Sequence, residues 1–204
     1  ASYKKNNFCG TFGNTVGTNG LTANEACCAC GGGKDDNDPD ATVWTCCADK
    51  LDDPCGCDEH VVCDENGMIT TIILDKCGVT GELKSDIFIP LIGLKKLRMG
   101  DNPFLIGVLP PALSLNTNLE HVRFSYTGMS GVLPESWSSL KKLNYLSLAF
   151  NKFSGTLPSA WSSMSQLTTL HLYRNQLTGT LPVAWSSMSQ LTKLFLHLNQ
   201  FAGT

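Results

Sequence analysis

The chain has 204 residues, a formal net charge of -3 and only 16% charged residues. This weak charge argues against a nucleic-acid-binding protein, which needs a clustered basic face to neutralise phosphates. No apolar stretch approaches the roughly 20 residues that a membrane-spanning helix requires, and the longest one is broken by Pro90 and Gly93. We therefore expect no membrane span in this chain, which is long enough to bury a sizeable core.

The ten cysteines all lie before residue 78, so the chain has two unlike halves. An even number of cysteines at this density is typical of disulfides, and hence of a secreted protein. A zinc site would need two separated Cys-x2-Cys pairs or a cysteine pair with a histidine pair, and that spacing is absent. We expect all ten to be paired, with a buried free thiol at Cys77 as the alternative. The predicted disulfide cysteines are Cys9, Cys27, Cys28, Cys30, Cys46, Cys47, Cys55, Cys57, Cys63 and Cys77.

Residues 1–40 are predicted to form a small Cys- and Gly-rich module that ends in a linker. Its stretch TANEACCACGGG resembles a short motif of extracellular proteins from algae and other protists, and the few apolar residues make its order depend on disulfides. The run DDNDPD at 35–40 has Asp at alternate positions, as in a calcium loop. The Gly and Glu of such a loop would fall at Ala41 and Cys47, so we expect a solvated linker and no metal site.

From residue 69 to residue 204 the sequence repeats itself. Glycines at 107, 131, 155, 179 and 203 are spaced by 24 residues, whereas the interval from Gly81 to Gly107 is 26. This period is longer than a strand and too short for a domain, so each repeat is one coil that buries its leucines only against its neighbours. We expect five coils and a partial sixth, which begin at Ile69, Leu94, Leu119, Leu143, Leu167 and Leu191.

Each coil carries the pattern L-x-x-L-x-L-x-x-N-x-L-x-G-x-L-P. The alternating leucines predict a short strand, and stacked coils place these strands in parallel about 4.8 Å apart. The recurring Asn fits a buried ladder, because its amide both donates and accepts hydrogen bonds. Leu-Pro ends strand pairing, since proline has no amide hydrogen, and Trp-Ser-Ser-Met is expected on the far, convex side. The predicted ladder is Asn102, Asn151, Asn175 and Asn199, with Cys77 and Thr127 as single hydrogen-bond donors in two coils.

Over residues 69–204 this pattern resembles the leucine-rich repeat proteins of the 24-residue plant type. The repeated AWSSMSQLT, at 160–168 and 184–192, is similar to repeats of the promastigote surface antigen and proteophosphoglycan family of kinetoplastid parasites. Residues 41–68 resemble the amino-terminal cap of plant-type repeats, which would cover the leucines of the first coil.

These resemblances imply an α/β-type repeat solenoid with short parallel strands on its concave face and an irregular or 3-10 convex side, preceded by a small disulfide-rich module. They also imply an extracellular or cell-surface protein, commonly lipid-anchored and glycosylated, although the chain shows no anchor signal.

The last two full repeats differ mainly on one face. Between 153–176 and 177–200, seven of 24 positions differ, and four of these are non-leucine positions of the strand segment. Tyr, Phe and Arg are enriched in binding hot spots, so we expect the concave face to bind a protein or a glycan. The candidate ligand-binding residues are Arg98, His121, Arg123, Tyr126, Tyr145, Phe150, His171, Tyr173, Arg174, Phe195 and His197.

We expect neither catalysis nor a cofactor. His121, His171 and His197 lie on different coils at non-equivalent positions, and no Asp or Ser accompanies them as a catalytic triad requires. The last coil stops at Thr204 without a polar cap. The alternative function is therefore that of a structural subunit, which assembles with copies of itself head-to-tail into an extracellular filament or coat.

Overall fold

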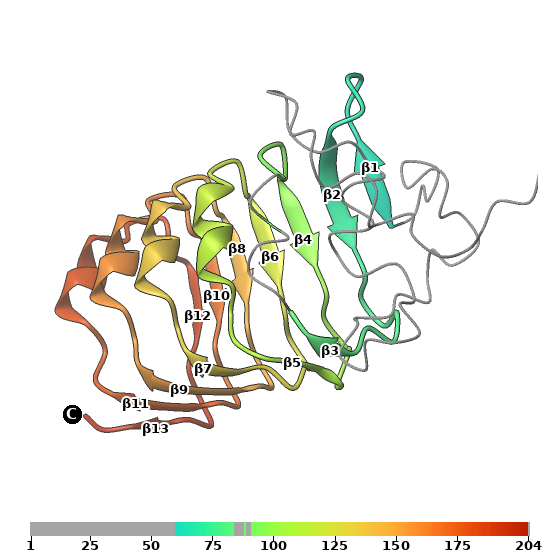
Figure 1. The fold of residues 1–204 in the computed structure, drawn as a ribbon. Helices are drawn as coiled ribbons and strands as arrows, with labels where there is room; N and C mark the ends of the chain where they lie inside the picture. The colour runs from blue at the N-terminus through green and yellow to red at the C-terminus, as the bar shows by residue number, and fades with distance from the viewer. Residues whose placement is uncertain (1–59, 84–87, 89–90, 204) are drawn as a thin grey trace, which may run out of the picture.

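A computed structural model describes residues 60–83, 88 and 91–203, which wind into successive coils stacked along one axis (Figure 1). The predictions for residues 1–59 lie outside this part of the chain. They comprise the amino-terminal module, the acidic linker, most of the predicted cap and eight of the ten cysteines.

One side of the coils carries a seven-stranded sheet in the order β1-β2-β4-β6-β8-β10-β12. All neighbours are parallel except β1, which pairs antiparallel with β2 at the edge of the sheet. Paired residues such as His121 and Tyr145 are one repeat apart in sequence, as the period predicts. The strands are β1 (Val61–Cys63), β2 (Ile69–Ile73), β4 (Lys96–Arg98), β6 (His121–Arg123), β8 (Tyr145–Ser147), β10 (Thr169–His171) and β12 (Lys193–Phe195).

A second side carries short 3-10 helices, each of which begins directly after a proline in extended conformation. The Trp residue of each of the last three points into the core, where its indole Nε1 donates to a proline carbonyl of the preceding coil at 2.9 to 3.0 Å. No helix in the described part of the chain is long and apolar enough to cross a membrane. The helices are η3 (Pro111–Leu115), η4 (Glu135–Ser139), η5 (Ser159–Ser163) and η6 (Val183–Ser187).

A third side carries a parallel sheet that the sequence analysis did not anticipate. It has four strands in the order β13-β11-β9-β7, and β3 and β5 form a two-stranded sheet near the start of the array (Figure 1). The expectation of an irregular or 3-10 convex side is therefore incomplete. These strands are β3 (Gly81–Glu82), β5 (Leu105–Ile106), β7 (Ser130–Val132), β9 (Lys152–Thr156), β11 (Gln176–Gly179) and β13 (Gln200–Phe201).

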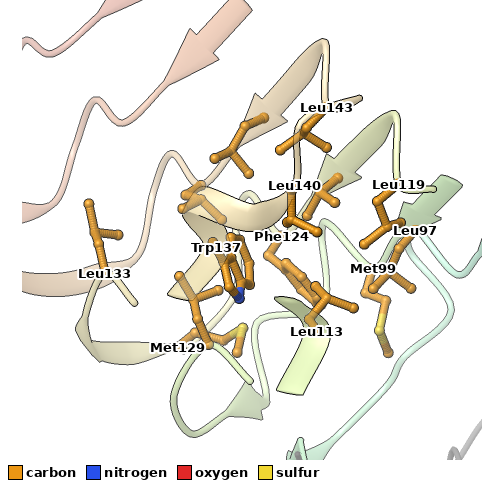
Figure 2. Close-up of a cluster of buried hydrophobic side chains, with 14 of the residues drawn as sticks. Leu97, Met99, Leu113, Leu119, Phe124, Met129, Leu133, Trp137, Leu140 and Leu143 are labelled. Carbon is orange, nitrogen blue, oxygen red and sulfur yellow. The ribbon is translucent and has the colours of Figure 1, made fainter. Parts of the chain in front are cut away.

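The core is a single column of apolar side chains enclosed by the three sides. Figure 2 shows how neighbouring coils share it: Leu97 and Met99 come from one coil, and Phe124 and Trp137 come from the next. Phe124 and Trp137 are fully buried. Because each coil contributes only part of the apolar surface, a coil is stable only against its neighbours.

The asparagines join consecutive coils. Asn175 Nδ2 donates to the carbonyls of Leu148 at 2.9 Å and Leu172 at 3.0 Å, and its Oδ1 accepts from the Phe153 amide at 3.0 Å. One side chain thus satisfies backbone groups of two coils where both turn away from the sheet. Equivalent bonds link Asn102 to Leu74, Met99 and Val79, and Asn199 to Leu172, Leu196 and Leu177.

Two coils lack an asparagine at this position. The Thr127 hydroxyl lies 2.5 Å from Asn151 Oδ1 and 3.2 Å from the carbonyl oxygen of Phe124. Cys77 is buried and, like Cys63, disulfide-bonded. A disulfide sulfur has no hydrogen to donate, so the expectation of a weak thiol donor at Cys77 does not hold.

Candidate functional site

The solvent side of the seven-stranded sheet, called the concave face below, presents four columns of side chains. In the three-residue strands β4, β6, β8, β10 and β12, the first residue of each strand belongs to the first column and the last residue belongs to the second column. The residues that lie two and three positions after the end of each strand form the third and fourth columns. The candidate residues fall in these columns as follows: His121 and Tyr145 in the first, Arg98, Arg123, His171 and Phe195 in the second, Tyr173 and His197 in the third, and Tyr126, Phe150 and Arg174 in the fourth.

Eight rings, called the aromatic surface below, form a continuous set of contacts across four coils. They are His121, Tyr126, Tyr145, Phe150, His171, Tyr173, Phe195 and His197.

Three pairs of these rings stack face to face between neighbouring coils. The ring centroids are 4.2 Å apart for His121 and Tyr145, 3.7 Å for Tyr126 and Phe150, and 4.7 Å for Tyr173 and His197. Each aromatic pair contributes about 0.5 to 1.5 kcal/mol beyond the burial of its area. The rings are thus held in place before any ligand arrives.

Edge-to-face contacts join the stacked pairs to one another. His171 lies 5.6 Å from Tyr145 and 4.8 Å from Phe195, and Tyr173 lies 5.2 Å from Phe150, all measured between ring centroids. The guanidinium carbon of Arg174 lies 5.0 Å from the centre of the Phe150 ring, in a cation–π contact.

His121 and His171 of this surface favour the neutral form. Burial, together with Arg98, Lys96 and Arg123, lowers the pKa of His121 to about 4, although Asp75 opposes part of this shift. Burial and Lys193 also lower the pKa of His171. At neutral pH these two imidazoles are therefore uncharged and serve as aromatic contact surface rather than as cations.

The other end of the concave face holds an ion-pair cluster of Asp75, Arg98, Asp101 and Arg123. Arg123 Nη1 lies 2.8 Å from Asp75 Oδ1, and Arg123 Nη2 lies 2.9 Å from Asp101 Oδ2, while Arg98 also contacts Asp75. Burial opposes the charge on Arg123, but its hydrogen bonds to Asp101 and Asp75 outweigh burial and raise its pKa.

Gly100 makes room for this cluster. A Cβ at this position would lie 2.0 Å from Arg123 Nη1, and the Gly100 amide donates to Asp75 Oδ1 at 2.7 Å. Arg98 and Arg123, two of the three arginines named as candidate ligand contacts, thus already contact carboxylates. Sequence reasoning did not single out Asp75, Gly100 or Asp101, because only the fold brings them beside Arg123.

The concave face therefore has two parts, an ion-pair cluster on the earlier coils and the aromatic surface on the later ones. Tyr126 and Phe195 are 44% and 41% exposed, so the aromatic surface is open to solvent. Within the described residues, no group of three or more His, Cys, Asp or Glu side chains is placed to hold a metal ion. The arrangement is suited to contact and recognition.

Comparison with known proteins agrees with this geometry. Residues 145–201 match the model of the leucine-rich repeat family. No curated protein sequence matches the chain.

Many solved structures share the fold, among them the following three. The first is a plant ice-binding protein with 33% identity and a TM-score of 0.71, for which the match covers 78% of this chain and 51% of that one. The second is the ectodomain of the receptor kinase SOBIR1 from Arabidopsis thaliana, with 26% identity, a TM-score of 0.66 and coverage of 74% and 86%. The third is the plant peptide hormone receptor RGFR1 in complex with RGF2, with 28% identity, a TM-score of 0.63 and coverage of 65% and 21%.

This chain thus spans about half of the ice-binding protein and about a fifth of the hormone receptor. The narrower resemblance to kinetoplastid surface antigens and the amino-terminal cap stay predictions. The described residues form a leucine-rich repeat solenoid.

Proposed function

We propose that the chain is an extracellular recognition protein whose aromatic surface binds an extended peptide segment of a protein partner. The observation that carries this proposal is the continuous set of eight rings on four coils. Aromatic side chains dominate binding hot spots, because they offer a large contact area with few rotatable bonds. The fold of a plant peptide hormone receptor over a fifth of its length supports a peptide ligand.

The ring geometry favours a peptide over a glycan. Sugars bind aromatic residues through exposed ring faces, whereas Tyr145 and Phe150 each have one face covered by a ring of the preceding coil. Arg174 lies over the Phe150 ring as well. Stacked rings present mainly their edges, the phenol hydroxyls and the imidazole nitrogens, which suit the backbone amides and carbonyls of an extended chain.

The test is selection of peptides from a random display library on the purified chain, followed by calorimetry with the selected peptides. We expect the triple variant Tyr145→Ala, His171→Ala and Tyr173→Ala to lose binding. The control Phe104→Ala removes an aromatic ring that is 72% exposed but lies off the concave face, and it should bind as the wild type does. Peptides that bind the triple variant and the wild type equally would refute the proposal, and binding of oligosaccharides alone would favour a glycan ligand.

Head-to-tail assembly into a filament stays a prediction. Sedimentation of the purified chain tests it, since a monomer at high concentration contradicts self-assembly.

We propose ice binding as a second candidate function. The likeness to a plant ice-binding protein extends over 78% of this chain at 33% identity. A solenoid also repeats similar side chains at a fixed spacing, which suits a periodic ligand better than an irregular one. The measurement is thermal hysteresis of the purified chain, together with inhibition of ice recrystallisation. Absence of both activities at high protein concentration would exclude this function.

A further inference from the structure

The sheet formed by β7, β9 and β11 presents small side chains to solvent in a repeating pattern. Each coil places one outward residue before and one after a central glycine: Ser130 and Val132, Ser154 and Thr156, and Thr178 and Thr180, of which Thr180 directly follows β11. The residues flanking the first two trios in the chain, such as Phe153 and Leu157, are buried, whereas Leu181 after the third trio is exposed. These six outward residues, called the hydroxyl face below, are serine and β-branched side chains alone.

The strand pairing turns these positions into a regular array. Val132 pairs with Ser154, and Thr156 pairs with Thr178, so neighbouring coils are offset by 22 residues rather than by a full repeat. Cross-strand neighbours are about 4.8 Å apart, and outward residues on one strand are about 6.6 Å apart, which is two residues at about 3.3 Å each. The face therefore repeats at short, regular intervals both along the strands and from coil to coil.

The glycine of each coil fixes the orientation of an outward side chain on the preceding coil. A Cβ on Gly155 would lie 3.1 Å from Val132 Cγ1, and a Cβ on Gly179 would lie 2.9 Å from Thr156 Cγ2. The β-branched side chain of one coil thus lies over the bare glycine of the next. Because β-branched residues have few χ1 rotamers, their methyl and hydroxyl groups are held in a defined orientation. The Thr178 hydroxyl is fixed further by donation to the Gly155 carbonyl at 3.3 Å.

The chemistry of this face differs from that of the concave face. Lys152, which precedes the outward pair on β9, is the one charged residue in β7, β9 and β11. The concave face carries bulky rings and ion pairs that change from coil to coil. A crystal surface requires similar contacts at every step, and the small serine, threonine and valine side chains of the hydroxyl face provide them better than the varied side chains of the aromatic surface do.

We propose that the hydroxyl face is the ice-binding surface of this protein. The inference rests on the second proposed function and adds the location of the site. Threonine and valine methyl groups and the serine and threonine hydroxyls would together contact ordered water at the ice surface, and their preorganised side chains would lose little conformational entropy.

The test is thermal hysteresis with the double variant Thr156→Lys and Thr180→Lys. Both positions are exposed, so the longer side chains can extend into solvent without entering the core. The matched control is Ser165→Lys with Ser189→Lys, which adds the same charge at exposed positions beyond the 3-10 helices. Circular dichroism and thermal melting establish that the variants are folded.

We expect the wild type and the control to show hysteresis and the Thr156/Thr180 variant to lose it. If the lysine variant does not fold, Thr156→Ser with Thr180→Ser keeps the hydroxyls and removes the methyl groups, and hysteresis should fall clearly below that of the wild type. Hysteresis retained by a folded lysine variant, or unchanged in the serine variant, would overturn the location while ice binding itself stood. A wild-type protein without thermal hysteresis would refute both the ice-binding function and the proposed location of its site.

Discussion

Replacement of Asn175 by alanine tests the physical basis of the array. The change removes three hydrogen bonds of 2.9 to 3.0 Å and a longer one of 3.5 Å to the Tyr173 carbonyl, and the consequences for the partners of the three short bonds differ. The carbonyl of Leu148 still accepts from Asn151, and that of Leu172 still accepts from Asn199, whereas the Phe153 amide loses its partner inside the core. A buried unsatisfied donor costs about 1 to 3 kcal/mol and each lost bond about 0.5 to 1.5 kcal/mol. We therefore expect a loss of about 2 to 5 kcal/mol in the free energy of unfolding.

Asn199→Ala provides a matched control, because Asn199 makes the same three bonds in the last coil but is partly exposed. Water can replace the lost partner there, so this variant should cost less. The assay is urea unfolding followed by circular dichroism, with the midpoint and slope of each variant compared with those of the wild type. An Asn175→Ala variant as stable as the wild type, or less affected than Asn199→Ala, would refute the account of the ladder.

Two further predictions concern Gly155 and His121. Gly155→Ala places a Cβ against Val132 at a φ of +77°, and it should destabilise the chain by about 1 to 2 kcal/mol in urea unfolding. A neutral effect would show that the backbone at Gly155 and the Val132 side chain can shift to accommodate the added methyl group. His121 has a pKa lowered to about 4 when folded, so the unfolded chain takes up this proton first, and stability should fall as the pH decreases from about 6.5 towards 4. His121→Phe keeps the ring against Tyr145 and should remove this part of the pH dependence in unfolding midpoints. An unchanged pH dependence would mean that other groups cause it.

The sequence predicted the elements whose residues repeat with a simple period. Leucines such as Leu146 and Leu148 mark the main strands, and the tryptophans mark the 3-10 side. The second sheet could not be predicted in this way, because the alternation of outward and buried residues is interrupted by a glycine with positive φ, as at Gly155 and Gly179. Strands of this kind are held by pairing between coils rather than by the pattern of one coil.

Thr127 replaces asparagine in the ladder for a physical reason that could not be recognised from the sequence alone. The coil that begins at Leu94 has one extra residue after Asn102, so the Leu105 amide donates to the Asn102 carbonyl at 3.0 Å and needs no side chain from the next coil. A smaller residue then suffices at 127. The Thr127 hydroxyl also lies between the Met129 amide at 3.5 Å and Asn151 Oδ1 at 2.5 Å, where it can relay the hydrogen bond.

The candidate site was predicted residue by residue but not as an arrangement. Exposed strand positions are readily assigned from the leucine pattern, so the candidate residues could be named. Whether a residue such as Arg123 is available to a ligand depends on Asp75, which lies 48 residues earlier in the chain. It also depends on the missing side chain of Gly100. Interactions of this range have no signature in a single sequence.

The fourth column of the concave face has a left-handed backbone in every coil. Its five members, Asp101, Tyr126, Phe150, Arg174 and Leu198, all have φ between +55° and +58°, a conformation that costs a residue with a side chain about 1 kcal/mol or more. The glycine column, at 131, 155 and 179, adopts positive φ without this cost. The fourth column could have used glycine as well, and glycine would be the less strained choice.

The difference between the two columns lies in what surrounds them. In the glycine column a Cβ would lie 2.9 to 3.1 Å from a side-chain carbon of the preceding coil, so a side chain is disfavoured. In the fourth column three of the side chains contact one another, with Tyr126 stacked against Phe150 and Arg174 over the same ring. These contacts offset the strain only if the side chains contribute to packing or to binding, and strain retained at exposed positions is typical of functional sites. We propose that packing and binding coincide at Tyr126 and Phe150, because these two positions combine the left-handed backbone of the fourth column with stacked rings.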